Sequence, residues 1–170
     1  MGYDKTVEIR GALELLELDM KSPYARLTLT ELLVAGEAVV CLAAASLIIA
    51  LLPFRTVTLI AGSLGAHERG MESGEHDQLR DCCTAIKRCA RRLPWKAVCF
   101  QQGLALQMML RRRDMGSTLH YGVAQTATAL KAHVWISVAG RVVIGGETLE
   151  RFAEVASFPR RDLGSEDFSR

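Results

Sequence analysis

Cys99 and His133 are of residue types that suit nucleophilic catalysis, and the chain around each indicates a defined element. Pro94 disfavours helix at the residue before it and can open a new helical turn. From residue 99 to residue 112 the chain is rich in Leu, Met, Ala and Gln, which favour helix. Cys99 is therefore expected in the first turn of a helix, where unpaired N–H groups and the positive end of the dipole favour a thiolate. A free cysteine is more often a small core residue, so the position alone does not establish catalysis.

A thiolate nucleophile needs a base within hydrogen-bond reach. His133 lies in Ala132–Val138, which is rich in β-branched and aromatic residues and is expected to form a strand. We expect its imidazole to face the helix that begins at Cys99, whereas a half-buried structural histidine is the competing interpretation. His120, in the preceding predicted strand, is a weaker candidate for the base.

The elements expected to position these residues change from helical to strand-like after Gly116. Helices are predicted over residues 5–20, 28–52, 55–64, 78–92 and 99–112, and strands over 118–124, 132–138 and 141–144. Ala139-Gly140 has the length of a two-residue hairpin turn, and residues 148–155 are expected to form a last short helix. This order indicates an α+β fold. We expect an N-terminal helical region at 1–74, a catalytic domain at 75–158 and a polar tail at 159–170.

The composition describes one globular domain, with or without a helical extension. The chain has 170 residues, of which 49% are apolar, enough for a sizeable core. A net charge of +2 and an aromatic content of 6% argue against nucleic-acid binding. The five cysteines form no CxxC pair, and the N-terminus lacks the basic start and apolar run of a signal peptide. Free thiols in the cytoplasm are therefore expected.

The most apolar stretch is Ala38–Phe54, in which Ser46 is the single polar residue. At 17 residues it is just short of the length that comfortably spans a bilayer. A helix covered on all sides by its neighbours is the preferred explanation, and contact with a membrane is the alternative.

Two polar segments carry side chains that could bind a ligand. Gly65–Asp77 contains two histidines and three glutamates, but their spacing matches no ligand motif, so an exposed linker without a metal or cofactor is expected. The second is basic, and it consists of Lys87, Arg88, Arg91, Arg92 and Lys96, with Arg111–Arg113 further along the chain. These cations could receive an acidic peptide segment or form a solvated face.

Two blocks of the chain resemble the leader peptidase family of lasso-peptide biosynthesis. They are LPWKAVCFQQGLALQMMLRRRDMGSTLHYGV, which contains Cys99, and KAHVWISVAGRVVIGGETLERFAEVASFP, which contains His133. The resemblance covers about residues 78–158, and the apolar helix ending in Leu51–Phe54 is also similar. It implies a transglutaminase-like (papain-like) core, with the Cys-bearing helix packed on an antiparallel sheet and a hydrophobic helical extension before it.

The resemblance also implies a role for each site residue. Cys99 would be the nucleophile and His133 its base, and in that family an Asp near the end of the next strand orients the His. Here Gly145 falls at about the expected position of the acid, and the nearest carboxylate is Glu147. We expect Glu147 to substitute for the Asp, with a backbone carbonyl or a water as alternatives. The missing acid also leaves open a noncatalytic scaffold of the same fold.

The implied activity is removal of the leader from a lasso-peptide precursor before macrolactam formation. The Cys99 backbone N–H would hold the oxyanion, together with a second donor that the sequence does not identify. Papain-like enzymes supply a Gln upstream of the Cys, but none lies between Gln78 and Cys99. Gln101 and Gln102 could donate to a substrate or point to water.

The implied partners are the precursor peptide, a separate leader-recognition protein and an asparagine-synthetase-like macrolactam synthetase. The apolar face of Ala38–Phe54 could dock the recognition protein. A cytoplasmic location is expected, with peripheral membrane contact through the same helix as the alternative.

Overall fold

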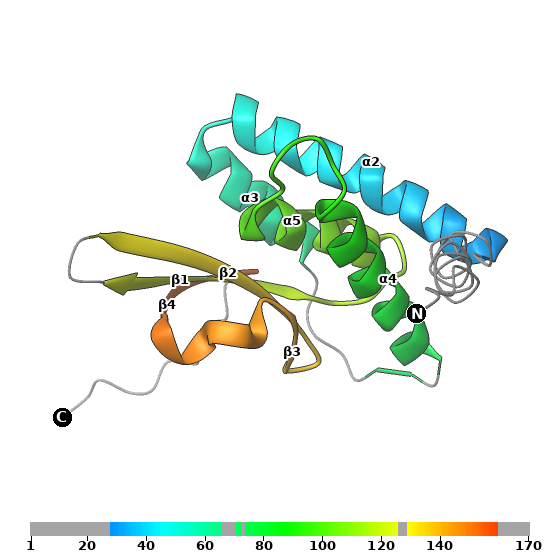
Figure 1. Ribbon diagram of the computed structural model, residues 1–170. Helices are drawn as coiled ribbons and strands as arrows, with labels where there is room; N and C mark the ends of the chain where they lie inside the picture. Colours follow the sequence, from blue (N-terminus) through cyan, green and yellow to red (C-terminus); the bar gives the residue numbers. More distant parts are fainter. Residues whose placement is uncertain (1–27, 66–70, 73, 126–128, 160–170) are drawn as a thin grey trace, which may run out of the picture. The chain divides into compact units, whose positions relative to one another are not determined.

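The protein is described by a computed structural model, in which residues 28–65, 71–72, 74–125 and 129–159 are described. The chain divides into two compact units, residues 1–32 and 33–170. Apart from the first residues of α2, every element lies in the second unit (Figure 1). The elements in order are α2 (Leu29–Leu51), α3 (Phe54–Leu64), α4 (Glu75–Ala90), α5 (Cys99–Arg111), β1 (Thr118–Gln125), β2 (Leu130–Val138), β3 (Arg141–Ile144), the 3₁₀ helix η1 (Gly146–Arg151) and β4 (Ala153–Phe158).

The four strands form one antiparallel sheet in the order β3-β2-β1-β4. β2 and β3 are joined by Ala139 and Gly140, whose φ angles of 49° and 74° are both positive. A two-residue turn of the primed type requires this geometry. The predicted hairpin is therefore confirmed, and helices followed by antiparallel strands confirm the α+β class.

Helix α5 lies close against the sheet because it presents a glycine to it. A Cβ atom added at Gly103 would come within 3.1 Å of Val134 Cγ1 and within 3.5 Å of side-chain atoms of Ile136 and Leu119. These three apolar residues are buried, and they form the floor on which α5 packs. This contact fixes the start of α5, at Cys99, beside β2.

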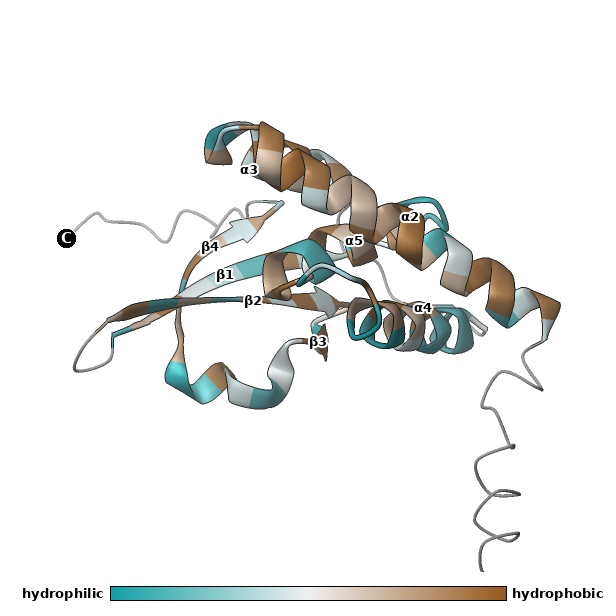
Figure 2. Cartoon of the chain, turned by 45° about the horizontal axis from the view of Figure 1, so that its top comes forward, coloured by the Kyte–Doolittle hydropathy of each residue, from teal (hydrophilic) through white to brown (hydrophobic). Residues whose placement is uncertain are grey.

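Helix α2 is only partly covered, which corrects the expectation of a helix buried on all sides. Only 22% of its most apolar window is buried within the structure. Leu33, Val40, Leu47 and Leu51, which we call the apolar face, recur on one side of the helix, and each is more than half exposed. Among the described residues, α2 is long and apolar enough to cross a membrane by length and composition. Figure 2 shows the hydrophobic colouring continuing along α2 and α3.

Aromatic rings connect the corner between α2 and α3 to α5 and the sheet. The Phe54 ring centroid lies 6.0 Å from that of Phe100 and 5.8 Å from that of Tyr121. In the segment before α5, the Trp95 indole Nε1 donates a hydrogen bond of 3.1 Å to Ser46 Oγ. The start of α5 is thus held from the α2 side as well as from the sheet.

The last part of the domain differs from the prediction. Residues 148–155 were expected to form a helix, but Gly146–Arg151 is a 3₁₀ helix and Ala153–Phe158 is strand β4. β4 pairs with β1, and this pairing with a distant segment leaves little trace in the local pattern. The predicted linker is also shorter, because α4 already begins at Glu75. The predicted helix at 5–20 and the tail beyond residue 159 lie outside the described residues.

An ion pair joins α2 to the end of α5. The guanidinium of Arg113 donates two hydrogen bonds to the carboxylate of Glu37, at 2.6 Å from Nη2 and 3.0 Å from Nη1. The two side chains are 20% and 14% exposed. These hydrogen bonds from Arg113 hold the pKa of Glu37 below its ordinary value.

We expect Glu37→Gln to lower the free energy of unfolding by about 2 kcal/mol at neutral pH, because it leaves a half-buried guanidinium without its carboxylate. The lowered pKa means that the pair stabilises the fold above the ordinary glutamate pKa of 4.5 and loses this contribution as the pH falls through the lower folded value. Urea unfolding at neutral and at acid pH measures the loss of unfolding free energy and its dependence on pH. Asp77→Asn, which breaks an exposed pair with Arg80, is the control and should cost less than about 0.5 kcal/mol. An equal penalty for Glu37→Gln at both pH values would contradict this account.

Candidate active site

A pocket of about 290 Å³ opens beside β2 at the point where β3 ends. β3 pairs only with residues 136–138 of β2, so the preceding part of β2 has no partner on that side among the described residues. The walls come from α4, α5, β2 and the start of η1. They are formed by Lys87, Ala90, Arg91, Cys99, Gln102, His133, Val134, Ile144, Gly145 and Glu147. The structure therefore brings all three predicted site residues, Cys99, His133 and Glu147, to one pocket.

Cys99 is the first residue of α5, and its side chain is half-buried in the pocket wall. Val98 precedes the helix and provides no side-chain cap. The first backbone hydrogen bond of the helix runs from the Gln102 N–H to the Val98 carbonyl, at 3.1 Å. The N–H groups of residues 99–101 therefore have no acceptor within the helix, and they carry the positive end of its dipole at the thiol.

The other four cysteines belong to the core. Cys41 and Cys82 are buried, Cys83 and Cys89 are half-buried, and none of them lines the pocket. Burial raises the pKa of each of these thiols, that of Cys83 to about 11. All five cysteines are free, so Cys99 is distinguished by its place in the pocket wall.

The tautomer of His133 follows from its hydrogen bond. Nε2 lies 2.9 Å from the carbonyl oxygen of Gly145. A carbonyl only accepts, so Nε2 carries the hydrogen, and in the neutral ring Nδ1 keeps its lone pair. The ring also packs against Phe152, with centroids 5.0 Å apart, and against Trp135, at 6.3 Å. The ring is thereby held with the lone pair of Nδ1 available to accept a proton.

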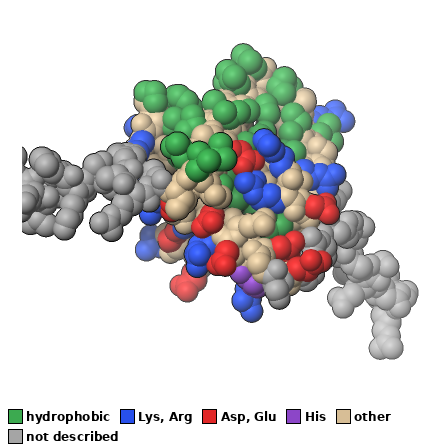
Figure 3. Space-filling model, turned by 90° about the vertical axis from the view of Figure 1, so that its right-hand side faces the viewer, with side chains coloured by type: hydrophobic (Ala, Val, Ile, Leu, Met, Phe, Trp, Pro, Cys, Tyr) green, Lys and Arg blue, Asp and Glu red, His purple; other side chains and the backbone are tan. Residues whose placement is uncertain are grey.

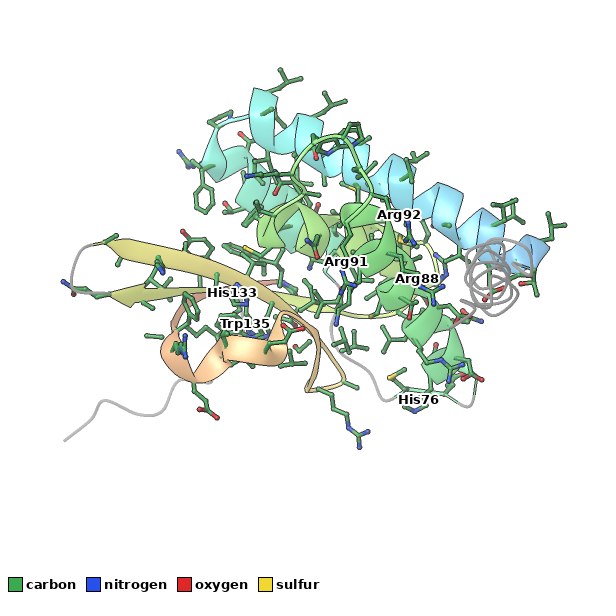
Figure 4. The ribbon with its side chains drawn as sticks, in the orientation of Figure 1. His76, Arg88, Arg91, Arg92, His133 and Trp135 are labelled. Carbon is green, nitrogen blue, oxygen red and sulfur yellow. The ribbon has the colours of Figure 1, made fainter. Side chains whose placement is uncertain are left out.

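The face of β2 that carries His133 differs from the prediction. Val134 and Ile136 point at Gly103 of α5, and successive side chains of a strand alternate between faces. His133 therefore leaves β2 on the face away from α5, with Trp135 (Figure 4). Its imidazole does not face the helix of Cys99, although His133 lines the same pocket as Cys99. Among the described residues, no hydrogen bond joins His133 to Cys99.

Glu147 lines the pocket but does not make the contact expected of it. Its side chain is 72% exposed, and Oε1 lies 3.7 Å from Nζ of Lys87. Its pKa is lowered, first by a hydrogen bond from its own backbone and then by the charge of Lys87, with a smaller effect from His133. The orienting hydrogen bond comes instead from the carbonyl of Gly145, which stands at about the acid position of the resembling family.

Gly145 cannot be replaced by an acid without disturbing the site. Its φ of 80° is in the left-handed region, and a Cβ atom there would come within 2.6 Å of the Val134 carbonyl oxygen. The chain thus orients His133 with the backbone carbonyl of Gly145, at a position where there is no room for a side chain.

His120, the rival base, is committed to a buried network. Its Nδ1 lies 2.9 Å from Glu154 Oε1 and its Nε2 lies 2.9 Å from Ser137 Oγ. The ring stacks on Trp135 with centroids 5.4 Å apart. Both ring nitrogens have partners, and His120 does not line the pocket. We assign His120 a structural role, which is to support Trp135, and Trp135 in turn packs against His133.

Gln102 is the residue that sequence reasoning left undecided. It lines the pocket one helical turn after Cys99, and its Nε2 donates a hydrogen bond of 2.7 Å to the carbonyl of Ala97. This bond uses one hydrogen of the amide and turns the side chain back toward the start of α5. The amide carries a second hydrogen, and Gln102 lines the same pocket as Cys99.

The transglutaminase-like superfamily is the family that matches this chain. Its family model covers residues 42–157, and the chain therefore belongs to the transglutaminase-like superfamily. The search of curated proteins and the search of solved structures find no match. The matched region begins inside α2, so it includes helices that the predicted division at residues 74 and 75 separates from the catalytic domain. The compact unit of residues 33–170 includes them as well.

Alkylation should distinguish Cys99 from the other thiols. At neutral pH we expect iodoacetamide to modify Cys99 first, because burial raises the pKa of the other four and leaves them with little thiolate. Raising the pH should bring in Cys89 before Cys83, whose pKa is about 11. Timed alkylation followed by peptide mass spectrometry measures the order. Modification of all five thiols at one rate in the folded protein would contradict this assignment.

Proposed function

We propose that this protein is a cysteine peptidase that removes the leader from a lasso-peptide precursor before macrolactam formation. The observation that carries the proposal is the common pocket of Cys99, at the first turn of α5, and His133, whose tautomer is set by Gly145. The superfamily to which the chain belongs includes cysteine peptidases. The choice of a leader peptide as substrate is supported by the sequence resemblance around these two residues.

Cleavage begins when Sγ of Cys99 attacks the carbonyl carbon at the junction of leader and core. Nδ1 of His133 takes up the thiol proton and returns it to the amine of the core as the peptide bond breaks. The leader then remains on Cys99 as a thioester. A water molecule, deprotonated by His133, attacks the thioester and releases the leader carboxylate and the thiol.

The oxyanion formed in both attacks requires hydrogen-bond donors. The backbone N–H of Cys99 is one, because it has no acceptor within α5. We assign the second amide hydrogen of Gln102 as the other donor, since its first hydrogen fixes the amide through the Ala97 carbonyl. This Gln follows the nucleophile, whereas papain-like enzymes place theirs before it.

Cys99 and His133 must approach each other for the proton to transfer, and no hydrogen bond joins them before substrate binds. Catalytic hydrogen bonds are often long in the free enzyme and shorten in the complex. Substrate backbone bound in the pocket would exclude water between the imidazole and the thiol. The neutral Gly145 carbonyl stabilises a charged imidazolium less than a carboxylate does, which favours a slow enzyme.

Four substitutions should give graded losses of cleavage. We expect Cys99→Ala and His133→Ala each to reduce kcat/KM by about 10³-fold or more, because each removes a reacting group. Gln102→Glu should reduce kcat by about 100-fold with little change in KM, since a carboxylate cannot donate to the oxyanion. Glu147→Gln should cost less than about fivefold, because it removes only an exposed charge near His133.

The assay is cleavage of a candidate precursor peptide, chosen from the genes that neighbour the gene of this chain, followed by mass spectrometry. Circular dichroism and thermal melting of each variant establish that the fold is kept. Wild-type cleavage by Cys99→Ala or by His133→Ala would refute the assigned role of that residue. A loss with Glu147→Gln as large as with His133→Ala would show that the carboxylate, and not the Gly145 carbonyl, orients the base.

A noncatalytic scaffold in a peptide-maturation complex is the second candidate. It is favoured by the glycine at the acid position and by the absence of a direct hydrogen bond between Cys99 and His133. A scaffold requires no reactive thiol, so it predicts slow alkylation of Cys99 and no hydrolysis of any precursor. Cleavage that depends on Cys99 would exclude it.

By the same resemblance, a separate leader-recognition protein would deliver the precursor, and an asparagine-synthetase-like macrolactam synthetase would take the released core in the cytoplasm. The apolar face of α2 is our candidate for docking the recognition protein, because Leu47 and Leu51 are large apolar side chains that are 59% and 76% exposed. Leu47→Glu with Leu51→Glu should abolish copurification of the two proteins, whereas Arg141→Glu on the β2–β3 hairpin should not. Loss of flotation with lipid vesicles, without loss of the protein partner, would assign the face to a membrane instead.

A further inference from the structure

A group of cations borders the pocket on the side of α4. Lys87 and Arg91 belong to the pocket wall, and Arg88, Arg92 and Lys96 continue the group away from it. We call these five residues the basic strip. Figure 4 shows Arg88, Arg91 and Arg92 coming from the α4 side, with His133 and Trp135 on β2. Figure 3 shows Lys and Arg side chains gathered next to a hydrophobic region of the surface.

Four of the five cations of the strip are poorly compensated by the described part of the chain. Lys87 has a single distant carboxylate, Glu147, at 3.7 Å. Among the described residues, Arg88, Arg91 and Lys96 have no ion-pair partner. Lys87, Arg88, Arg91 and Arg92 lie within six residues at and just beyond the end of α4, so their like charges repel one another.

Favourable contact with the helix dipole explains only part of this arrangement. Cations suit the last turn of a helix, so Lys87 and Arg88 are stabilised at the end of α4. Lys96 lies well beyond that end, and Arg91 lines the same pocket as the nucleophile. A purely solvated face would not require a cation in the wall of the site.

The position of the basic strip beside the pocket limits which class of anionic molecule can bind to it. A flat bilayer cannot reach cations in the wall of a pocket, although it can reach those on the outer surface. A nucleic acid would require a larger basic surface and stacking aromatics, whereas the net charge is +2 and the aromatic content is 6%. A peptide segment can enter the pocket, and guanidinium groups bind carboxylates through paired hydrogen bonds.

We infer that the basic strip binds acidic side chains of the peptide substrate next to the bond that is cut. Arg91 and Lys87 contact the carboxylates nearest the scissile bond, and Arg88, Arg92 and Lys96 contact those further out. The strip thereby selects peptides that carry Asp or Glu on one side of the junction. As a statement about substrate choice, this inference rests on the proposed peptidase function.

The experiment separates binding from cleavage by using the full chain with Cys99→Ala. Fluorescence anisotropy measures the Kd of a short labelled peptide with three Glu residues, and of the same peptide with Gln in their place. We expect the Glu peptide to bind about 10-fold tighter or more at low salt, and this preference to shrink as salt is added. Arg91→Gln should remove most of the preference. Arg141→Gln, with the same change of charge outside the pocket, should leave it unchanged.

Equal affinity for the two peptides, or an equal effect of Arg91→Gln and Arg141→Gln, would overturn the inference. Tighter binding to phosphatidylglycerol vesicles or to a single-stranded oligonucleotide, lost in Arg91→Gln, would assign the strip to a membrane or to nucleic acid instead. The peptidase function is tested separately with the wild-type chain. Cleavage of the Glu and Gln peptides at equal rates would support the peptidase function but contradict substrate selection by the basic strip. Selective binding of the Glu peptide without cleavage would contradict the peptidase function but support binding of acidic peptides by the strip.

Discussion

The close approach of α5 to the sheet at Gly103 is the constraint on which the site depends. Val134 Cγ1 stands where a larger residue at position 103 would need room, so the distance between helix and sheet is set by the absence of a side chain. With that distance fixed, the first residue of α5 lies beside the open edge of β2. Because Val134 and Ile136 pack against Gly103 in the core, the alternation of side chains along β2 places His133 on the opposite face of the sheet.

The orientation of His133 by a backbone carbonyl changes how the missing acid is understood. A glycine at the acid position first indicates a lost catalytic group. The left-handed backbone of Gly145 turns its carbonyl oxygen onto Nε2, however, so the tautomer that the acid would set is still set. What a neutral acceptor does not supply is charge to stabilise the imidazolium. The geometry that a catalytic base at His133 would need is therefore present, whereas the charge that an acid would add is not.

The sequence predicted the local elements well and their faces less well. The start of α5 at Cys99 follows from Pro94 and from the composition after it, and the β2–β3 turn follows from the spacing of two strand-like runs. β4 was missed because its partner, β1, lies far away in the chain. The prediction that His133 faces α5 was wrong, because strand alternation shows which side chains share a face but not which face the helix covers. The roles of Gly145 and Gln102 depend on a carbonyl and an amide hydrogen, which a residue type alone does not place.

The aromatic cluster around Phe54 has a consequence for any molecule that covers the α2–α3 corner. Phe54 is more than half exposed, yet its ring packs on Phe100, the residue next to Cys99. A partner that covered this exposed ring would therefore contact a side chain that packs on the first turn of the helix beginning at Cys99. Binding at the outer surface would in this way bear on the position of the Cys99 thiol.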